Sequence, residues 1–587
     1  MKALNKEKSV WIILGLMCLC SSVIRAILAI KMGTVSIIYD ELLYWDISKS
    51  IVDKTSILMR GLMVSNKDIL YSLLISWVHM FKNIDMAYNA TLILNAIIMS
   101  TVVFPVYIMA YDILKNKKLS VFIALISIIM PEMFYTTKLL QENLYYPLMM
   151  WAFCFFVHCI MKKPYDLKRV GIYVCYLSVL VYVKNIGLCV IVGFILFYVI
   201  LIFLEKDKNQ KRKIPLMVIE IAAIYLILKK IMDSIITNVF SQNGENAVSS
   251  LSQSTFNRML DVKSYINYIY PIITYVAYGI LLFGIFTVII SIAYFKYLNQ
   301  KEQALLIFNI CVLATTLGVV CLLILQADQE VGEKITRLHM RYFYYAFLPF
   351  LILFIRLYNV IRVKGMIPAC WVLSVIYGIL IIICPSEIKQ GSQVDSIAAN
   401  SLQAFFMTAV RQKGLKILII IGIIVGCWLI YKKYCKALYA CVCLVLLALC
   451  IHSTQKAYSV SMWERNALEG MKTDGDLLTQ ELSDKVEGMN DVLIVAVNKA
   501  TSGVMETHLE ILYRVCQIDD LLASGIWNDG QINYNKLDFY GMTKYNLTEH
   551  YEPRYLIVQG SIQVPNYEVC DSLSLQNFIL YQRKENK

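Results

Sequence analysis

Long apolar runs recur along most of the chain and constrain its fold more than any other feature. Thirteen of them approach or exceed the length of about 20 residues that a helix needs to cross a bilayer. They lie at about 10–30, 88–113, 119–137, 143–161, 170–185, 186–204, 214–236, 271–295, 304–325, 342–358, 367–384, 415–431 and 437–452. Only 17% of the residues are charged and 58% are hydrophobic, a balance that does not fit a soluble protein. The sequence therefore predicts a polytopic α-helical membrane protein with about thirteen transmembrane helices.

The first apolar run shares one feature with a signal peptide, because it follows Lys2, Lys6 and Lys8. It is long enough to span the bilayer, however, and no small-residue cleavage site follows it. We therefore expect the run at 10–30 to stay in the protein as its first transmembrane helix.

Basic residues cluster in the short segments between the runs and indicate the orientation of the chain. With a cytoplasmic N-terminus, clusters such as those at 115–118, 162–169 and 206–213 all fall on the cytoplasmic side. Three cations of the outer side do not fit this pattern: Lys389, Arg411 and Lys413. We expect a multi-pass protein of the cell membrane with its C-terminal end outside. The net charge of +13 then reflects orientation, and no nucleic-acid partner is expected.

The composition changes near residue 453 and predicts two domains. Residues 1–452 form the transmembrane domain, with a first outer loop at 31–87, and residues 453–587 form a small extracytoplasmic α/β domain. Within the second domain we expect strands at 491–497, 554–558 and 578–582 and a helix at 505–516.

Two further segments are expected on the outer side. The apolar stretch 69–81 is too short to span the bilayer and is predicted to lie in the membrane interface. The segment 237–270, rich in Ser, Asn and Gln, is consistent with a mobile lid or a plain linker.

Residue types that commonly bind metals and cofactors form no recognisable pattern. The 17 cysteines include no CxxC pair and no zinc spacing, and most are interpreted as small buried hydrophobes. His79 and His339 lie far apart, so no metal site is predicted. No Gly-rich phosphate loop appears, which argues against a nucleotide-sugar donor. No cofactor is expected; a divalent metal is left open but is not indicated.

Residues 38–48 follow the first helix and carry the adjacent carboxylates Asp40 and Glu41 on a stretch expected to form a short amphipathic helix. Two interpretations are open. The helix dipole favours acidic residues near a helix start, so the pair can simply stabilise a solvated helix. Alternatively, a carboxylate held at the mouth of a membrane-embedded site serves as a general base.

Other charged residues are expected on the same side at a similar depth. Glu142 lies between the third and fourth helices, Lys184 ends the fifth, and Arg341 opens the tenth, with Arg337 one turn before it. Singly, the cations are also typical of side chains that reach lipid headgroups, and Glu142 of a helix cap. Together, fixed cations suit a lipid-phosphate donor, and a carboxylate suits an acceptor hydroxyl that attacks an anomeric carbon.

The order of these residues resembles the GT-C superfamily of polyprenyl-phosphate-sugar-dependent glycosyltransferases, in the branch of protein O-mannosyltransferases and the lipid A aminoarabinose transferase. The resemblance covers residues 1–350 and rests on four motifs: Asp40-Glu41-Leu-Leu-Tyr44, Pro131…Tyr135…Gln141-Glu142, Val183-Lys184-Asn-Ile-Gly187 and Arg341-Tyr342…Pro349. Val183 stands where the family has Thr, and residues 66–71 lack the family's Pro-Pro. The later helices and the C-terminal domain show no residue-level match.

The resemblance implies an inverting membrane glycosyltransferase that moves a sugar from a polyprenyl-phosphate carrier to an extracytoplasmic acceptor. The acceptor would be a cell-envelope glycan, a lipid or a protein. Asp40 would be the catalytic base, and Glu41 and Glu142 would shape the acceptor or sugar site. The donor phosphate would be bound by Lys184, Arg337, Arg341 and Tyr342, and the acceptor or sugar would contact Tyr44 and Arg60.

Two other classes stay open. A transporter or flippase of lipid-linked sugars would also place charges within a bundle. It should show inverted repeats and helices broken at the midplane, and the sequence indicates neither. A polymerase or ligase of lipid-linked oligosaccharides would depend on outer arginines more than on an Asp-Glu pair.

Overall fold

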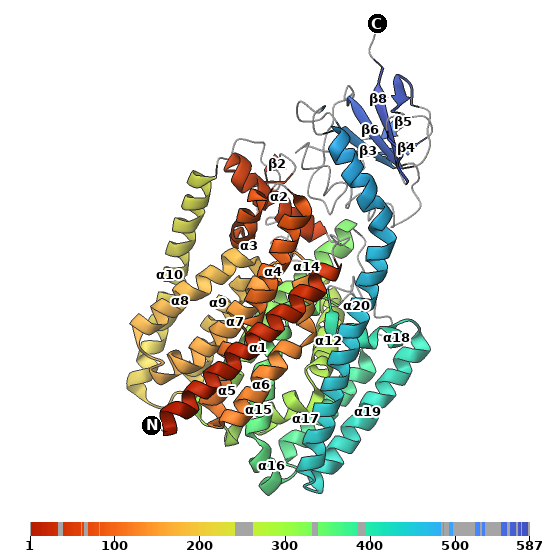
Figure 1. The fold of residues 1–587 in the computed structure, drawn as a ribbon. Coiled ribbons are helices and arrows are strands. Elements are labelled where there is room, and N and C mark those ends of the chain that lie inside the picture. The colour runs from red at the N-terminus through yellow and green to blue at the C-terminus, as the bar shows by residue number, and fades with distance from the viewer. Residues whose placement is uncertain are drawn as a thin grey trace.

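The protein is an elongated helical bundle with a small sheet beyond one end (Figure 1). The computed structural model describes residues 2–32, 39–59, 62–63, 68–81, 83–240, 262–331, 338–384, 395–482, 485, 492–496, 523–528, 531–533, 553–559, 564–570, 573–576 and 578–584. The statements that follow concern these residues.

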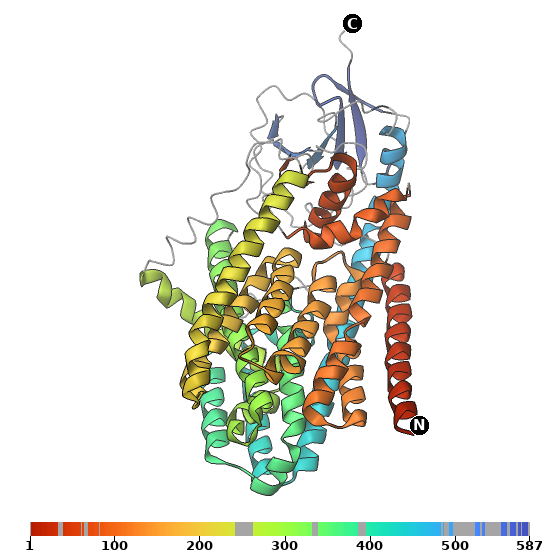
Figure 2. The same ribbon diagram turned by 90° about the vertical axis from the view of Figure 1, so that its left-hand side faces the viewer.

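The bundle is built from helices most of which run roughly between its two ends (Figures 1 and 2). They are α1 (Lys2–Met32), α4 (Ile84–Ser100), α5 (Val103–Leu114), α6 (Lys117–Ile129), α7 (Glu142–His158), α8 (Leu167–Val183), α9 (Leu188–Leu204), α10 (Lys208–Val239), α12 (Val262–Leu282), α13 (Ile285–Ala293), α14 (Gln300–Val331), α15 (Phe347–Arg356), α17 (Pro368–Ile383), α19 (Ala409–Tyr431) and α20 (Cys435–Leu482).

Shorter elements connect these helices and cover one end of the bundle. The α-helices among them are α2 (Tyr39–Lys54), α3 (Leu70–Ile75), α16 (Tyr358–Lys364) and α18 (Gln403–Phe406). The 3-10 helices are η1 (Ser76–Met80), η2 (Pro131–Thr137), η3 (Ile160–Lys162), η4 (Asn185–Gly187), η5 (Phe295–Tyr297), η6 (Met340–Tyr342), η7 (Tyr344–Ala346) and η8 (Ile397–Leu402).

Each of the thirteen apolar runs lies on helix, but the predicted number of thirteen spans is not confirmed. Among the described residues, seven helices are long and apolar enough to cross a membrane, or up to ten if each bent pair is one span. Two others fall just short in length, since α8 has 17 residues and α17 has 16. The protein is therefore a multi-pass α-helical membrane protein.

Three pairs of successive helices are bent by more than 40° at a short break, which corrects the expectation of continuous helices. The sharpest break separates α12 from α13, whose axes differ by 99°. Gly284 provides the break, because it adopts a φ of +83°, which side-chain-bearing residues rarely tolerate. The sequence does not reveal the break, since apolar composition continues on both sides of it.

Several helices start where a polar side chain satisfies a free backbone N–H group. Asn83 caps α4 by accepting from the N–H of Met86, and Asn116 caps α6 by accepting from Leu119. Such N-caps typically stabilise a helix by about 1 kcal/mol. They fix the ends of apolar helices whose interiors carry no other start signal.

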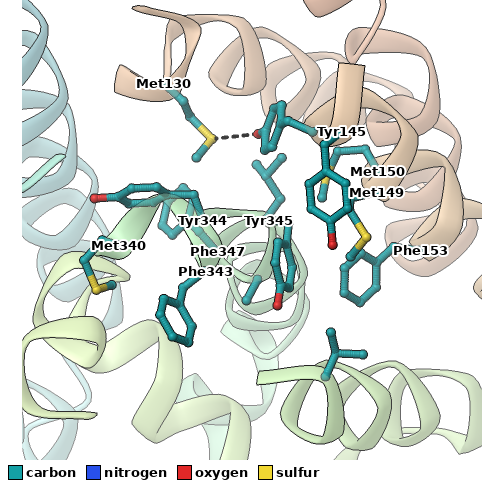
Figure 3. Packing of buried hydrophobic residues seen from close by; sticks show 14 of the residues in the cluster. Met130, Tyr145, Met149, Met150, Phe153, Met340, Phe343, Tyr344, Tyr345 and Phe347 are labelled. Atoms are coloured by element: carbon teal, nitrogen blue, oxygen red, sulfur yellow. Dashed lines mark hydrogen bonds between the residues drawn. The ribbon is translucent and has the colours of Figure 1, made fainter. Parts of the chain in front are cut away.

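The core of the bundle contains many aromatic and methionine side chains. Figure 3 shows Tyr345 close to Met149 and Phe153 of α7. The rings of Phe153 and Tyr345 lie 6.1 Å apart. The segment that follows η6 is thereby packed against α7, which fixes the distance between these two parts of the chain.

The helices α2, α3 and η1 form a layer at the end of the bundle nearest the C-terminal sheet (Figure 2). The predicted interfacial stretch is the pair α3–η1, too short to span a membrane. A two-stranded hairpin of β1 (Leu58–Met59) and β2 (Leu62–Met63) follows α2. Most of the predicted lid or linker, 237–270, lies outside the described residues.

The C-terminal part contains a six-stranded mixed sheet with strand order β5-β4-β3-β6-β8-β7. Its strands are β3 (Val492–Ala496), β4 (Ala523–Asn528), β5 (Gln531–Asn533), β6 (Tyr555–Gln559), β7 (Tyr567–Val569) and β8 (Ile579–Arg583). The three predicted strands correspond to β3, β6 and β8, and β3 is parallel to both β4 and β6. The predicted helix at 505–516 lies outside the described residues. The change in composition near 453 falls within α20, which is continuous to Leu482.

Candidate active site

The first component of the site is the start of α2. Asp40 and Glu41 both lie in its first turn, where the helix dipole favours negative charge, but they have different surroundings. Asp40 is partly exposed, with an Oδ2 atom 3.0 Å from Nη1 of Arg341. Glu41 is fully buried, and its Oε1 accepts a hydrogen bond of 2.7 Å from the backbone N–H of Leu139. Glu41 thus ties α2 to the segment that leads into α7.

The second component is a buried ion pair between two helix ends. Glu142 is the first residue of α7, and Lys184 is the C-cap of α8. The Lys184 Nζ donates to Glu142 Oε1 at 2.5 Å, and their side chains are 10% and 5% exposed. A lysine that only reached for lipid headgroups would be far more exposed, so the pairing replaces that interpretation of Lys184.

The third component is Arg341. It lies in the 3-10 turn η6 and not in the first turn of a spanning helix, because the backbone makes two short turns before α15 begins at Phe347. Its guanidinium contacts Asp40 and also lies 3.8 Å from Glu142 Oε1 and 3.9 Å from Asp395 Oδ1, both measured from Nε. Arg341 therefore joins the α2 start to the Glu142–Lys184 pair.

Backbone contacts with residues 395–396 hold Arg341 in place. The N–H of Arg341 donates to the carbonyl of Asp395 at 2.8 Å, and the N–H of Met340 donates to Ser396 Oγ at 2.8 Å. The Ser396 hydroxyl in turn donates to the carbonyl of Leu338. The two segments are far apart in sequence, and these contacts fix where the guanidinium can lie.

An aromatic ring covers the two cations. The Tyr342 ring lies 4.7 Å from Lys184 Nζ and 5.1 Å from Arg341 Cζ, measured to its centroid. Such cation–π contacts are attractive and more so where water is excluded. Tyr342 therefore helps to hold both positive charges at one place.

The exposed fractions of these side chains show which part of the site faces outward. The Asp40 side chain is 31% exposed, whereas those of Arg341 and Asp395 are 14% and 5% exposed. Asp40 is therefore the charged group of the network most accessible to an incoming molecule. Burial alone would lower the pKa of Arg341, but Tyr342 and the surrounding carboxylates raise it well above its ordinary value. Arg341 stays charged.

A further carboxyl, Asp68, lies beside the network. Its Oδ2 accepts from the Gln141 side chain at 3.2 Å and from the N–H of Asn185 at 3.4 Å, next to Lys184. Burial raises the pKa of Asp68, and these hydrogen bonds oppose that shift. Burial and the charges of Asp40, Asp68 and Glu142 also raise the pKa of Tyr44, so its phenol keeps its proton.

The structure brings together most, but not all, of the residues singled out from the sequence. Asp40, Glu142, Lys184, Arg341 and Tyr342 form one contiguous network. Tyr44 lies near it, and Glu41 points its bonded oxygen to a backbone group instead. Arg60 and Arg337 lie outside the described residues.

Sequence reasoning missed Asp395 and Asp68. Asp395 lies in a segment noted only because its cations do not fit the concentration of basic residues on the cytoplasmic side. Its partner Arg341 lies more than fifty residues earlier in the sequence, so no local pattern links the two. Asp68 stands in the stretch where the family's Pro-Pro is absent. In each case the sequence offers only an acidic residue on a segment expected to lie outside, and such a residue alone does not indicate a functional site.

The arrangement combines a partly exposed carboxylate with two buried cations a few ångströms away. Fixed Lys and Arg side chains can hold a phosphate, Arg through two parallel hydrogen bonds and Lys as a point charge. A carboxylate beside them can accept a proton from a hydroxyl. Within the part of the chain that the structure describes, no group of three or more His, Cys, Asp and Glu residues could hold a metal ion.

Comparison with known proteins gives only distant matches. No protein-family model and no curated protein matches the chain. Two crystal structures of ArnT from Cupriavidus metallidurans, in the apo state and bound to undecaprenyl phosphate, align with 10% identity and a TM-score of 0.45. The alignments cover 98% and 97% of both chains, respectively.

An oligosaccharyltransferase of Archaeoglobus fulgidus tethered to an acceptor peptide aligns with 10% identity and a TM-score of 0.40. This alignment covers 86% of this chain and 64% of that one. These solved structures are similar to the chain along most of its length. At these identities and TM-scores the likeness does not assign an activity to this chain.

Proposed function

We propose that the protein is a membrane glycosyltransferase that takes a sugar from a polyprenyl-phosphate carrier and transfers it, with inversion, to an extracytoplasmic acceptor. The observation that carries the proposal is the network in which Arg341 lies 3.0 Å from Asp40 and 3.8 Å from Glu142, itself paired with Lys184. A partly exposed carboxylate and two cations thus lie together at one end of the bundle.

In the proposed reaction, Asp40 accepts the proton of the acceptor hydroxyl while its oxygen attacks the anomeric carbon of the sugar. The bond between that carbon and the phosphate oxygen breaks, and its electron pair leaves with the polyprenyl phosphate. Lys184 and Arg341 stabilise the charge that the phosphate gains. Because phosphate is a weak base, its departure needs no general acid.

The remaining residues have supporting roles in this proposal. Glu142 orients Lys184 and Arg341, Tyr342 covers them, and Tyr44 contributes a neutral hydroxyl to the sugar site. Glu41 positions the start of α2 through its bond to Leu139. The residues Arg60 and Arg337 are proposed for the acceptor and for the phosphate on sequence grounds alone.

The orientation of the chain is part of the proposal. The basic clusters of the sequence favour a cytoplasmic N-terminus, which would place the site and the C-terminal sheet on the outer side of the cell membrane. The helix breaks do not favour a transporter, because Gly284, at the sharpest of them, faces the apolar side chains of Leu446 and the methyl of Thr287. A transporter would need polar or charged groups at such a break.

The test compares purified wild type with Asp40→Asn on a panel of polyprenyl-phosphate sugars. We expect the mutant to bind the donor and to lose roughly two to four orders of magnitude in turnover, because general bases contribute about that much. Glu41→Gln is the matched control, since it removes the neighbouring charge. We expect that control to keep turnover within roughly tenfold of wild type.

Two results would count against the proposal. If wild type turns over none of the donors while Asp40→Asn leaves cellular function intact, the protein is not this enzyme. If Glu41→Gln loses as much turnover as Asp40→Asn, the base is not Asp40 in particular.

A further inference from the structure

A groove on the surface of the bundle lies apart from the candidate site, where α18 meets the first turns of α19. Its volume is about 480 Å³, and six residues line it: Ala404, Phe405, Arg411, Gly414, Ile417 and Leu418. Arg411 is the one charged residue among them. A groove of this kind suits an apolar chain that ends in a negatively charged group.

Three cations lie close together at the start of α19, and one of them, Arg411, lines the groove. Arg411, Lys413 and Lys416 lie in the first two turns of α19, and no acidic residue lies in its first turn. Arg411 donates to the carbonyl of Ala404 at 3.3 Å, and Lys416 donates to the last carbonyls of α17. None of the ion pairs formed within the described ranges involves any of the three. Their positive charge is therefore not balanced by a described carboxylate.

The position of these cations is unusual for a membrane protein. They lie at the end of α19 that is remote from α16 (Figure 1). Most basic clusters of the chain lie at the end of the bundle that carries α16, as expected if basic residues concentrate on the cytoplasmic side. An anionic partner at the groove would account for the exception.

Among the described residues, the side chains around the groove are exposed. Met407 is 66% exposed and Val410 80% exposed, and Ile417 and Leu418 are each more than half exposed. On a helix long and apolar enough to span a membrane, such a surface faces lipid. The available partner with an apolar chain and a negative group is therefore a lipid of the bilayer.

We propose that this groove binds an anionic phospholipid of the surrounding membrane. One acyl chain lies along Gly414, Ile417 and Leu418, and the phosphate and headgroup pair with Arg411 and Lys413. Arg411 matches a phosphate through two parallel hydrogen bonds, and Lys413 adds a second charge. This proposal does not depend on the proposed enzymatic activity.

The test measures lipid binding to the full-length protein in detergent by native mass spectrometry. The probes are dioleoylphosphatidylglycerol, which is anionic, and dioleoylphosphatidylcholine, which has the same chains but no net charge. We expect phosphatidylglycerol to bind more tightly. Arg411→Gln with Lys413→Gln should weaken it by roughly thirtyfold, since each basic residue near a membrane surface contributes about 1 kcal/mol, or about fivefold.

Two further variants separate the groove from the charges. No atom lies within 4 Å of a Cβ built at Gly414 or at Gly422, so a larger side chain fits at either position without a backbone clash. Gly414→Leu should fill the groove and weaken phosphatidylglycerol binding without changing the charge. Gly422→Leu, two turns further along α19, is the control and should leave binding unchanged.

The possible outcomes decide the proposal. Equal binding of the two lipids, or phosphatidylglycerol binding unchanged in both the charge and the Gly414 variants, would overturn it. If undecaprenyl phosphate displaces phosphatidylglycerol and shows the same dependence on Arg411, the groove belongs to a polyprenyl lipid instead. Lys413→Gln alone keeps the test valid if Arg411→Gln disturbs folding, because Lys413 is exposed and does not share the contact with Ala404.

Discussion

The buried pair of Lys184 and Glu142 makes a quantitative test of the site possible without knowledge of the substrate. Replacing Lys184 by Met removes the cation that lies 2.5 Å from Glu142 and leaves that carboxylate 5% exposed. Removing one partner of a buried ion pair typically costs about 3–5 kcal/mol. Arg341, 3.8 Å away, still faces Glu142, so we expect a loss of about 2–4 kcal/mol.

The companion variant is Glu142→Gln combined with Lys184→Met. The double variant no longer buries an unpaired charge, so it should recover most of the lost stability. We expect a coupling of at least about 2 kcal/mol in the cycle formed by the two single variants and the double variant. Each kcal/mol shifts the melting temperature by roughly 1–2 °C in a chain this long, so Lys184→Met should melt roughly 2–8 °C below wild type.

The assay is the melting temperature in detergent, followed by intrinsic tryptophan fluorescence at one scan rate. Lys229→Met is the control, because it breaks an exposed i, i+4 pair with Asp233 at 2.7 Å, worth about 0.5 kcal/mol or less. If the effects of the two single site variants simply add in the double variant, Lys184 and Glu142 are not coupled and the description of the site is wrong.

Three other changes test separate parts of the structure. Burial lowers the pKa of His79 to about 4, below the ordinary value of 6.5. The unfolded chain therefore binds more protons between these values, and the melting temperature should fall as the pH drops from 6.5 to 4, less steeply in His79→Gln than in wild type. Asp395→Asn removes a charge 3.9 Å from Arg341 Nε and should cost about 1–2 kcal/mol of stability; an unchanged melting temperature would show that the carboxylate charge of Asp395 does not help to hold Arg341. Gly187→Ala would place a Cβ 2.6 Å from the carbonyl carbon of Leu180 and should cost about 1–3 kcal/mol, whereas Gly318→Ala, with no atom within 4 Å, should be nearly neutral.

Hydrophobic patterning predicted the helices well, because lipid imposes a minimum length of apolar sequence on every span. It could not predict where spans break. Gly284 interrupts one of them by a backbone conformation, and the apolar composition on its two sides is the same. It also could not predict that α20 extends past residue 453, since a polar helix outside the membrane continues an apolar one without any local signal.

For the site, the order of charged residues along the chain was informative because each lies at the end of a helix. Helices of similar length return the chain to the same side, so Asp40, Glu142 and Lys184 were expected at a similar depth. The contacts themselves depend on irregular backbone. Arg341 lies in a 3-10 turn held by Asp395 and Ser396, and no periodicity in the sequence predicts that turn.

The charges of the network suggest how the cations would act in the proposed reaction. Among the described residues it joins three carboxylates, Asp40, Glu142 and Asp395, with two permanent cations, Lys184 and Arg341, while the imidazole of His339 lies 3.4 Å from Asp395. A donor phosphate therefore does not enter a positive pocket; it must replace a carboxylate as a partner of a cation. Asp40 is the carboxylate best able to give way, because its side chain is the most exposed. Displacement from Arg341 would also free it to accept a proton. As the leaving phosphate gains its second charge, the two cations bind it more strongly than they bound the donor, and only such differential binding accelerates the reaction.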